Sequence, residues 1–318
     1  MTRELPGSEF VKLKKEHSVV VSASQVPPTI DELLYNVQEK DGLISLLTDP
    51  ITKEVIEAGS SLKVIANYAA GYDNIDVKHA TTRGIMVTNT PDVLTMATAE
   101  LTWALILAVA RSIPQADRYT REDKFEGWAP TLFAGAELYG STLGIIGAGK
   151  IGTEVGIRAK GFGMYILYTD LKENATLDKI GASKVTLREL LGKADFITIH
   201  VPLTRDTYKL IGKDELALMK PTAYLINVSR GKVVDEPLLI EALINKKIAG
   251  AGFDVYEGEP KVPNKLKHLD NVVLLPHIGS ATQITREQMA NLAIQNLLVG
   301  LSGGIPPNLV NPEVLRNS

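Results

Sequence analysis

Three ionisable side chains each follow a run of residues that predicts a β-strand. Arg230 comes after TAYLINVS, Glu259 after AGAGFDV, and His277 after NVVLLP. Open α/β sheets bind their ligands at the carboxyl ends of their strands, so these side chains could share one ligand site. An arginine can bind a carboxylate bidentately, a histidine can carry a proton near neutral pH, and a glutamate beside that histidine would stabilise its protonated form.

Each of the three residues also has an ordinary structural interpretation. An arginine in this position can simply pair with an acid, and a single glutamate is usually solvated. A histidine after a strand and a proline is usually a packing residue. The functional interpretation therefore depends on whether the three lie together.

A glycine-rich turn between two predicted strands is the second feature with chemical consequences. Gly147, Gly149 and Gly152 follow the apolar run TLGII and open a helical pattern, and the next predicted strand ends in Asp170. This arrangement predicts a dinucleotide-binding turn. The first glycine permits a tight turn, the second lets the backbone approach a pyrophosphate, and the third lets helix and strand pack closely. The helix N-terminus favours phosphate as well.

Asp170 indicates which dinucleotide would bind. Its carboxylate could accept hydrogen bonds from the adenosine ribose hydroxyls and would repel a 2′-phosphate, so NAD is favoured over NADP. Lys172 weakens this preference, because a nearby cation tolerates phosphate. The alternative is that Asp170 only caps a turn.

The chain alternates β-rich and helical runs, which predicts an α/β fold with parallel sheets. The first series of predicted strands is HSVVVS, GLISLL, SLKVIAN and GIMVTN, and the second is STLGIIG, MYILYTD, DFITIHVP, TAYLINVS, AGAGFDV and NVVLLP. We therefore expect two doubly wound sheets. The helical run ATQITREQMANLAIQNLLVGLSGG follows the second series, and we expect it to pack back on the first domain.

Composition narrows the class of protein. The 318 residues are 45% hydrophobic and 22% charged with a net charge of −3, which is typical of a globular protein of about two domains. No basic excess indicates a nucleic-acid partner, and the absence of cysteine excludes disulfides, thiolate metal sites and a cysteine nucleophile. We expect a cytoplasmic protein with no metal site.

No apolar run reaches the ~18 residues that a membrane span needs, and the N-terminus lacks the apolar core of a signal peptide. The run LTWALILAVA predicts a buried helix, because hardly any of its faces is polar. Burial in a domain core and burial in a subunit interface would both explain it. We expect no membrane partner.

Several motifs resemble those of the D-isomer-specific 2-hydroxyacid dehydrogenase family over almost the whole chain, and the glyoxylate/hydroxypyruvate reductase branch in particular. Besides the glycine-rich turn they are IANYAAGYDNIDV, VTNTPDVLTMATAEL, HVPLT, INVSRGKVVDEPLL, GAGFDVYEGEP and LLPHIGSAT. The resemblance implies a Rossmann cofactor domain, residues 92–278, inserted into a flavodoxin-like substrate domain, residues 1–91 plus 279–318. It also implies a homodimer formed through the helix that begins near Ala97.

The resemblance implies roles for residues on the substrate side. Ala70 and Gly71 would offer backbone N–H groups to the substrate carboxylate. Leu47 and Trp128 match positions that crowd the substrate pocket, with Trp128 reaching over from the partner subunit. Ordinary interface packing is the alternative for Trp128.

Other roles concern the cofactor. The family's catalytic arginine, glutamate and histidine fall on Arg230, Glu259 and His277, and Asp254 would hold the nicotinamide carboxamide. His200 is expected to be structural. The remaining residues implied at the cofactor are Ala148, Lys150, Ile151, Pro202, Val228, Ser229 and Gly279, beside the three glycines and Asp170.

The implied reaction is hydride transfer from NAD(P)H to a small 2-oxo acid, with glyoxylate or hydroxypyruvate favoured, giving a D-2-hydroxy acid. Arg230 would hold the carboxylate and polarise the carbonyl, and His277 would be the acid/base. Two alternatives share the fold. One is another D-2-hydroxyacid dehydrogenase such as phosphoglycerate dehydrogenase, which would need a basic cluster near Leu47 to bind the substrate phosphate. The other is a non-catalytic NAD-sensing scaffold, which long disordered tails would favour.

The N-terminus departs from the family pattern. Family members begin with a strand before a segment like TRELP, whereas this sequence begins MTRELP. In a flavodoxin-like order that strand would lie between HSVVVS and GLISLL. We therefore expect a gap there, and a truncated or misassigned start is the hypothesis that explains it.

Overall fold

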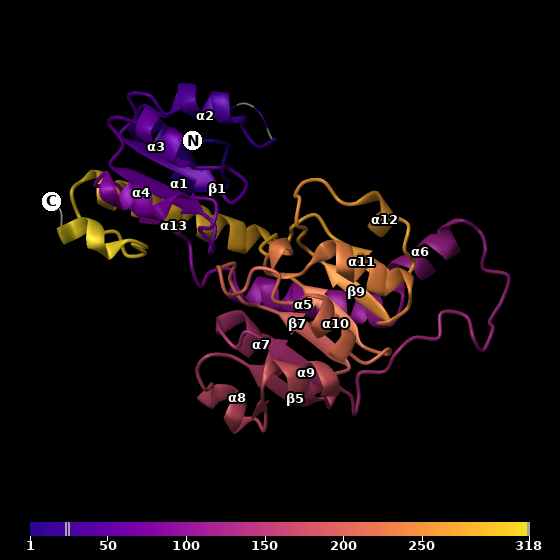
Figure 1. Cartoon of the computed structure of the whole chain (residues 1–318). Helices are drawn as coiled ribbons and strands as arrows, with labels where there is room; N and C mark the ends of the chain where they lie inside the picture. The colour runs from indigo at the N-terminus through magenta and orange to yellow at the C-terminus, as the bar shows by residue number, and fades with distance from the viewer. Residues whose placement is uncertain (23, 25, 317–318) are drawn as a thin grey trace. The chain divides into compact units, whose positions relative to one another are not determined.

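A computed structural model describes residues 1–22, 24 and 26–316, and it divides the chain into two compact units (Figure 1). Unit 1 comprises Met1–Leu94 and Ser280–Ser318, and unit 2 comprises Thr95–Gly279. Each unit is built on a parallel sheet with helices on it, so the predicted α/β fold class is confirmed.

Unit 2 contains a seven-stranded parallel sheet in the order β10-β9-β8-β7-β4-β5-β6. Its strands are β4 (Thr142–Ile146), β5 (Tyr165–Thr169), β6 (Ser183–Lys184), β7 (Phe196–Ile199), β8 (Tyr224–Asn227), β9 (Gly250–Phe253) and β10 (Val272–Leu274). All except the short, polar β6 were predicted. The strand order reverses between β4 and β7, and doubly wound sheets form their ligand crevice at such a point.

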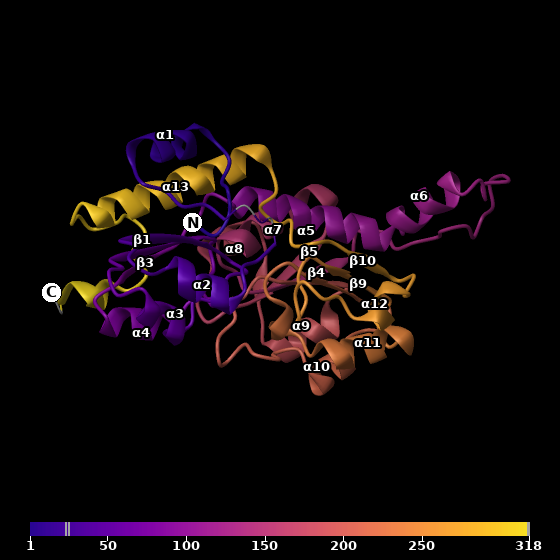
Figure 2. The same ribbon diagram turned by 90° about the horizontal axis from the view of Figure 1, so that it is seen from above.

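Helices cover both faces of this sheet, with α5 and α7 on one face and α9, α10 and α11 on the other (Figure 2). Their bounds, with those of the shorter helices, are α5 (Thr95–Ala110), α6 (Ile113–Arg121), α7 (Lys150–Ala159), α8 (Ala175–Lys179), α9 (Leu187–Lys193), α10 (Lys213–Leu218), α11 (Glu236–Ile244), α12 (Asn264–Lys267), η1 (Lys160–Phe162) and η2 (Gly231–Val233).

Helix α5 contains the apolar run whose burial the sequence left open. It packs on α7, β8 and β9, and its residues Leu105 and Ile106 belong to a core cluster of unit 2. Burial in the domain core therefore accounts for its composition. After α6 the chain extends away from the body of the unit (Figures 1 and 2).

Among the described residues, no single helix has the length and apolar character to cross a membrane. Only α5 and α6 taken together meet those two criteria, and they are bent by 62° where they join.

Unit 1 contains a three-stranded parallel sheet in the order β1-β2-β3. Helices α1 and α13 lie on one face and α2, α3 and α4 on the other (Figure 2). Helix α13 packs on β1 and β2, as predicted for the last helical run. The bounds are β1 (Gly42–Leu46), β2 (Val64–Tyr68), β3 (Met86–Thr88), α1 (Ser8–Glu16), α2 (Ile30–Asn36), α3 (Lys53–Ala58), α4 (Val77–Thr82), α13 (Gln283–Leu301) and η3 (Pro312–Arg316).

The predicted strand HSVVVS does not form, so this prediction was wrong. Two of its residues pair with the first residue of the chain: the amino group of Met1 donates to the Val20 carbonyl at 2.7 Å, and Ser22 N–H donates to the Met1 carbonyl at 3.2 Å. On the opposite side, Thr2 N–H donates to the Ile44 carbonyl of β1 at 3.2 Å. One residue of backbone is too little to join this segment to the sheet.

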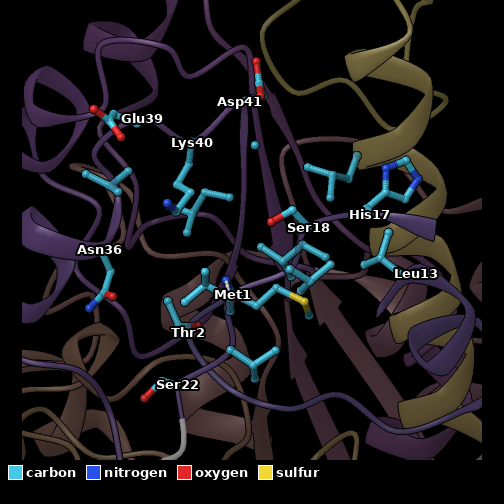
Figure 3. Close-up of a pocket in the computed structure, with 18 of the residues that line it drawn as sticks. Met1, Thr2, Leu13, His17, Ser18, Ser22, Asn36, Glu39, Lys40 and Asp41 are labelled. Atoms are coloured by element: carbon cyan, nitrogen blue, oxygen red, sulfur yellow. Dashed lines mark hydrogen bonds between the residues drawn. The ribbon is translucent and has the colours of Figure 1, made fainter. Parts of the chain in front are cut away.

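A cavity of about 400 Å³ lies next to Met1, between the HSVVVS segment and β1 (Figure 3). Its apolar walls come from α1, α2 and α13, through side chains that include Leu13, Leu33, Leu297 and Leu301. Burial lowers the pKa of the Met1 amino group to about 6, with the charge of Lys40 adding to the effect. The cavity separates the HSVVVS segment from β1.

Candidate active site

Glu259 and His277 are in direct contact. His277 follows β10 and Glu259 lies in the turn after the neighbouring strand β9, so parallel pairing brings both to the carboxyl edge of the sheet. The Nδ1 atom of His277 lies 2.8 Å from Oε2 of Glu259, and each side chain is 24% exposed. This contact can orient the imidazole ring.

The surroundings of Glu259 favour its ionised form. Burial alone would raise the pKa of this carboxyl group. The hydrogen bond to His277 and its charge, the N–H of Tyr256 and the charge of Arg230 outweigh burial, and they hold the pKa of Glu259 below its usual value. The Tyr256 N–H donates to Oε1 at 2.9 Å, so both carboxylate oxygens are used.

Arg230 lies in extended backbone between β8 and η2. Its Nη1 donates to the Ser229 carbonyl at 2.8 Å, and its own carbonyl accepts from Nδ2 of Asn227 at 3.0 Å. The next residue, Gly231, touches the segment that leads to Glu259: a Cβ atom on Gly231 would lie 1.9 Å from the carbonyl carbon of Tyr256. This close approach holds the Arg230 segment against the Glu259 segment. Gly231 was not predicted from the sequence, although its place directly after the arginine was a usable signal.

His277 has a positive φ of 55°, an uncommon conformation for a residue that is not glycine. The Asp254 side chain, at the end of β9, supports this turn. Its Oδ1 accepts from Ile278 N–H at 2.7 Å and its Oδ2 from Gly279 N–H at 2.8 Å. Burial raises the pKa of Asp254. Asp254 therefore anchors the histidine turn, and its role at the nicotinamide stays a prediction.

Tyr256 and Glu236 support the turn that carries Glu259, and neither residue was predicted from the sequence. The Tyr256 hydroxyl donates to the Leu275 carbonyl at 2.8 Å, which links this turn to the segment before His277. Glu257 N–H donates to Oε2 of Glu236 at 3.2 Å. Burial raises the pKa of Glu236.

The three glycines of the turn between β4 and α7 have the geometry that a dinucleotide needs. Gly147 has φ 93°, and a Cβ there would lie 2.8 Å from Cγ1 of Val201. A Cβ placed on Gly149, the residue that precedes α7, would face open space. A Cβ on Gly152 would lie 2.1 Å from the Gly147 carbonyl oxygen. The residues therefore fit a pyrophosphate at this helix N-terminus.

Asp170 follows β5, next to this turn. Its Oδ2 accepts from Ala148 N–H at 2.7 Å, and its Oδ1 accepts from Lys172 N–H at 3.2 Å. The second bond is the turn cap that the sequence allowed as an alternative, and the first ties the acid to the glycine-rich turn. Asn174, a further residue that the sequence analysis missed, donates to the Ala148 carbonyl at 2.7 Å.

An open pocket of about 470 Å³ lies at the glycine-rich turn. Its lining residues come from α5, from the turn itself, from the first turns of α7 and from the residue before α8; they are Thr95, Ala148, Gly149, Lys150, Thr153, Glu154 and Asn174. Among the described residues, no group of three or more His, Cys, Asp or Glu side chains could hold a metal ion.

Other residues expected at the cofactor lie at the carboxyl ends of the same strands. Pro202 is exposed after β7, and Val228 and Ser229 follow β8. Ile151 lies in the first turn of α7, and the Gly279 carbonyl accepts from the Thr98 hydroxyl at 3.2 Å.

His200 directly follows β7. In the described part of the chain neither of its ring nitrogens has a hydrogen-bond partner, and burial lowers its pKa to about 3. His200 was expected to be structural, and this buried environment suits that role.

The residues expected on the substrate side are not all in the same unit as the Glu259–His277 pair. Leu47, Ala70 and Gly71 belong to unit 1, the first in the turn after β1 and the others in the loop after β2. Trp128 belongs to unit 2 and lies in the segment after α6, where it is 83% exposed. Such exposure of a tryptophan is unusual and is compatible with a partner surface.

Known proteins resemble the whole chain. Residues 103–279 match the model of the D-isomer specific 2-hydroxyacid dehydrogenase, NAD binding domain. The glyoxylate reductase of Thermococcus litoralis is 50% identical over 100% of this chain and 98% of its own length, and that of Korarchaeum cryptofilum is 49% identical over 99% and 96%. The crystal structure of an NADPH-dependent glyoxylate/hydroxypyruvate reductase from Sinorhizobium meliloti, in complex with NADP and malonate, has a TM-score of 0.86 and 35% identity over 98% of this chain and 96% of its own. The chain therefore belongs to the D-isomer-specific 2-hydroxyacid dehydrogenase family.

Proposed function

We propose that the protein reduces a small 2-oxo acid, with glyoxylate or hydroxypyruvate favoured, to the D-2-hydroxy acid at the expense of NADH. The observation that carries this proposal is the contact of 2.8 Å between His277 and Glu259 at the carboxyl edge of a sheet that also holds the dinucleotide turn. The relatives named glyoxylate reductase support the choice of substrate class.

Each of the three ionisable residues has its own part in this reaction. Arg230 binds the substrate carboxylate through its planar guanidinium and polarises the carbonyl. Glu259 keeps the imidazole oriented, and His277 donates a proton to the carbonyl oxygen as the alcohol forms. When bound, the nicotinamide cofactor supplies the hydride that reaches the carbonyl carbon. In the oxidative direction neutral His277 takes the proton back.

The glycine-rich turn binds the dinucleotide in this proposal. Gly149 leaves room for a pyrophosphate and Asp170 accepts hydrogen bonds from the adenosine ribose, so NAD is preferred to NADP. The Asp170 carboxylate already holds Ala148 N–H at 2.7 Å, which keeps its charge next to the turn and disfavours a 2′-phosphate. Asp254 would hold the nicotinamide carboxamide.

Unit 1 is assigned to the substrate and unit 2 to the cofactor. Ala70 and Gly71 present backbone N–H groups to the substrate carboxylate, and Leu47 narrows the pocket. The enzyme would act in the cytoplasm as a homodimer, with the exposed Trp128 covered by the partner subunit, where it would add a wall to the pocket.

A substrate panel tests the proposal. NADH oxidation should be measured with glyoxylate, hydroxypyruvate, pyruvate and phosphohydroxypyruvate, and repeated with NADPH. His277→Asn should lower kcat by roughly 10²–10⁴-fold. His268→Asn is the matched control, since His268 is an exposed histidine of the same unit whose Nδ1 lies 2.7 Å from the Asn264 carbonyl oxygen. Absence of NADH oxidation with every acid, or full activity of the His277 variant, would overturn the proposal.

A further inference from the structure

Three successive carbonyl groups in the loop after β2 accept hydrogen bonds. Two of the donors lie just after β3, and the third belongs to β2 itself. The Ala69 carbonyl accepts from Thr90 N–H at 2.8 Å. The Ala70 carbonyl accepts from Nδ2 of Asn89 at 2.7 Å, and the Gly71 carbonyl accepts from Nδ2 of Asn67 at 2.9 Å. Every peptide group from residue 69 to residue 72 is thus held by its oxygen.

Fixing these oxygens also fixes the direction of the N–H groups. In a trans peptide the C=O and N–H bonds lie in one plane and point in opposite directions. The N–H groups of Ala70, Gly71 and Tyr72 must therefore point away from the donors that hold the carbonyls. Within the described part of the chain none of these three N–H groups has a hydrogen-bond partner. Neighbouring N–H groups that lack partners form an anion site.

We propose that Asn67 and Asn89 are positioning residues for the substrate carboxylate. Their side-chain amides orient the Ala70 and Gly71 carbonyls, and this presents the N–H groups of Gly71 and Tyr72 together to the anion. The inference rests on the proposed function, because the carboxylate it concerns is that of the 2-oxo acid. It also extends the expected set of donors to Tyr72.

The position of Asn67 suits this task. It is fully buried in β2, and its Oδ1 accepts from the Ser45 hydroxyl of β1 at 3.0 Å. Its Nδ2 also donates to Oδ1 of Asn74 at 3.0 Å. A side chain with this many partners holds one rotamer, so the Gly71 carbonyl has a fixed anchor.

The same network reaches the turn that contains Leu47. Nδ2 of Asn74 donates to the carbonyls of Leu46 and Asp49, at 3.0 Å each. The Leu46 N–H in turn donates to Oδ2 of Asp49 at 2.6 Å. The turn with Leu47 and the loop with the N–H groups are therefore parts of one hydrogen-bonded assembly within unit 1.

The test uses Asn89→Leu, which keeps the approximate size of the side chain and removes the donor. Asn89 is the better target because it is partly exposed and tolerates change more easily than Asn67. Asn311→Leu is the matched control: Asn311 is a buried amide of the same unit whose Nδ2 donates to the Ile85 carbonyl at 2.9 Å, away from the loop. Asn89→Ser, whose side chain is too short to reach Ala70, replaces the leucine variant if that does not fold.

The readouts separate positioning from stability. Asn89→Leu should raise the KM for glyoxylate roughly tenfold or more, with a smaller change in kcat and an unchanged Kd for NADH. The Ki of oxalate, a carboxylate of similar size, should rise in parallel with the KM. Asn311→Leu should lower the melting temperature and leave both constants unchanged.

The outcomes distinguish the two proposals. A wild-type protein that oxidises no NADH with any small 2-oxo acid contradicts the proposed function itself. A wild-type protein that is active, with an Asn89 variant whose KM and oxalate Ki equal those of the Asn311 variant, overturns the positioning role alone. Parallel rises in KM and Ki that occur only in the Asn89 variant support it.

Discussion

Replacing Gly231 with alanine should separate Arg230 from the segment that carries Glu259. A Cβ atom at this position would lie 1.9 Å from the carbonyl carbon of Tyr256, 2.1 Å from its oxygen and 2.3 Å from the nitrogen of Glu257. All three are backbone atoms, so no side chain can rotate away to make room. The two segments must therefore move apart.

The size of the movement follows from these distances. Ordinary contact begins near 3.4 Å, so the distance between the carbonyl carbon and the new Cβ atom must increase by 3.4 − 1.9 = 1.5 Å. A misplacement of about 1 Å at a reacting centre costs roughly 10²-fold in rate, and an overpacked methyl group costs about 1–3 kcal/mol of stability. We expect kcat/KM for glyoxylate to fall by about 10²-fold or more, measured by NADH oxidation, together with a lower melting temperature.

Gly258→Ala is the matched control, because Gly258 lies in the turn with Glu259 and a Cβ there would meet only the Lys261 carbonyl oxygen, at 3.7 Å. This variant should keep most of the activity. If Gly231→Ala retained activity within about threefold of the wild type, the close approach would not position Arg230. If both variants lost activity equally, the turn would be intolerant of any methyl group and the distance argument would fail.

Three further expectations can be tested separately. The pKa of Glu259 is lowered in the folded protein, so its ionised form stabilises the fold above the usual carboxyl range near 4.3, and this contribution disappears as pH falls through the lowered folded pKa. Glu259→Gln should therefore melt below the wild type at pH 7, by a margin that shrinks below about pH 4; calorimetry showing a constant margin would count against the ion pair. Asp170→Ala should narrow the ratio of kcat/KM for NADH over NADPH, and an unchanged ratio would remove Asp170 from cofactor choice. Light scattering should give twice the chain mass of 34.5 kDa, and a monomer would contradict the proposed cover for Trp128.

Much of unit 2 could be predicted from the sequence because its signals are local. The apolar runs that became β4, β7 and β8 are each buried along most of their length, and parallel strands covered on both faces need such runs. The positive φ of Gly147 and the contact of Gly152 with the Gly147 carbonyl involve residues close in sequence, so the spacing of the glycines was sufficient. The predicted strand HSVVVS shows the limit of this reasoning. Its composition suits a strand, but a strand also needs a partner at hydrogen-bonding distance.

The residues that support the candidate site could not be predicted either, because their roles depend on partners that are distant in the sequence. Tyr256, Glu236 and Asn174 have ordinary identities in the sequence, and their roles come from hydrogen bonds to segments distant along the chain. Asp254 was assigned to the cofactor by resemblance, which stays a prediction, and the support that its oxygens give to the turn of His277 was not foreseen.

The sequence by itself determined the fold class, the dinucleotide turn and the identity of the residues that could move a proton or bind a carboxylate, because these depend on residue type and short-range spacing. Only the tertiary structure decided that Glu259 and His277 touch at 2.8 Å and that Gly231 brings the Arg230 segment against the Glu259 segment. It alone also decided that two asparagines hold the loop of Ala70 and Gly71. Such contacts join residues from separate strands, and their geometry depends on how the sheet and its turns pack, which no local pattern encodes.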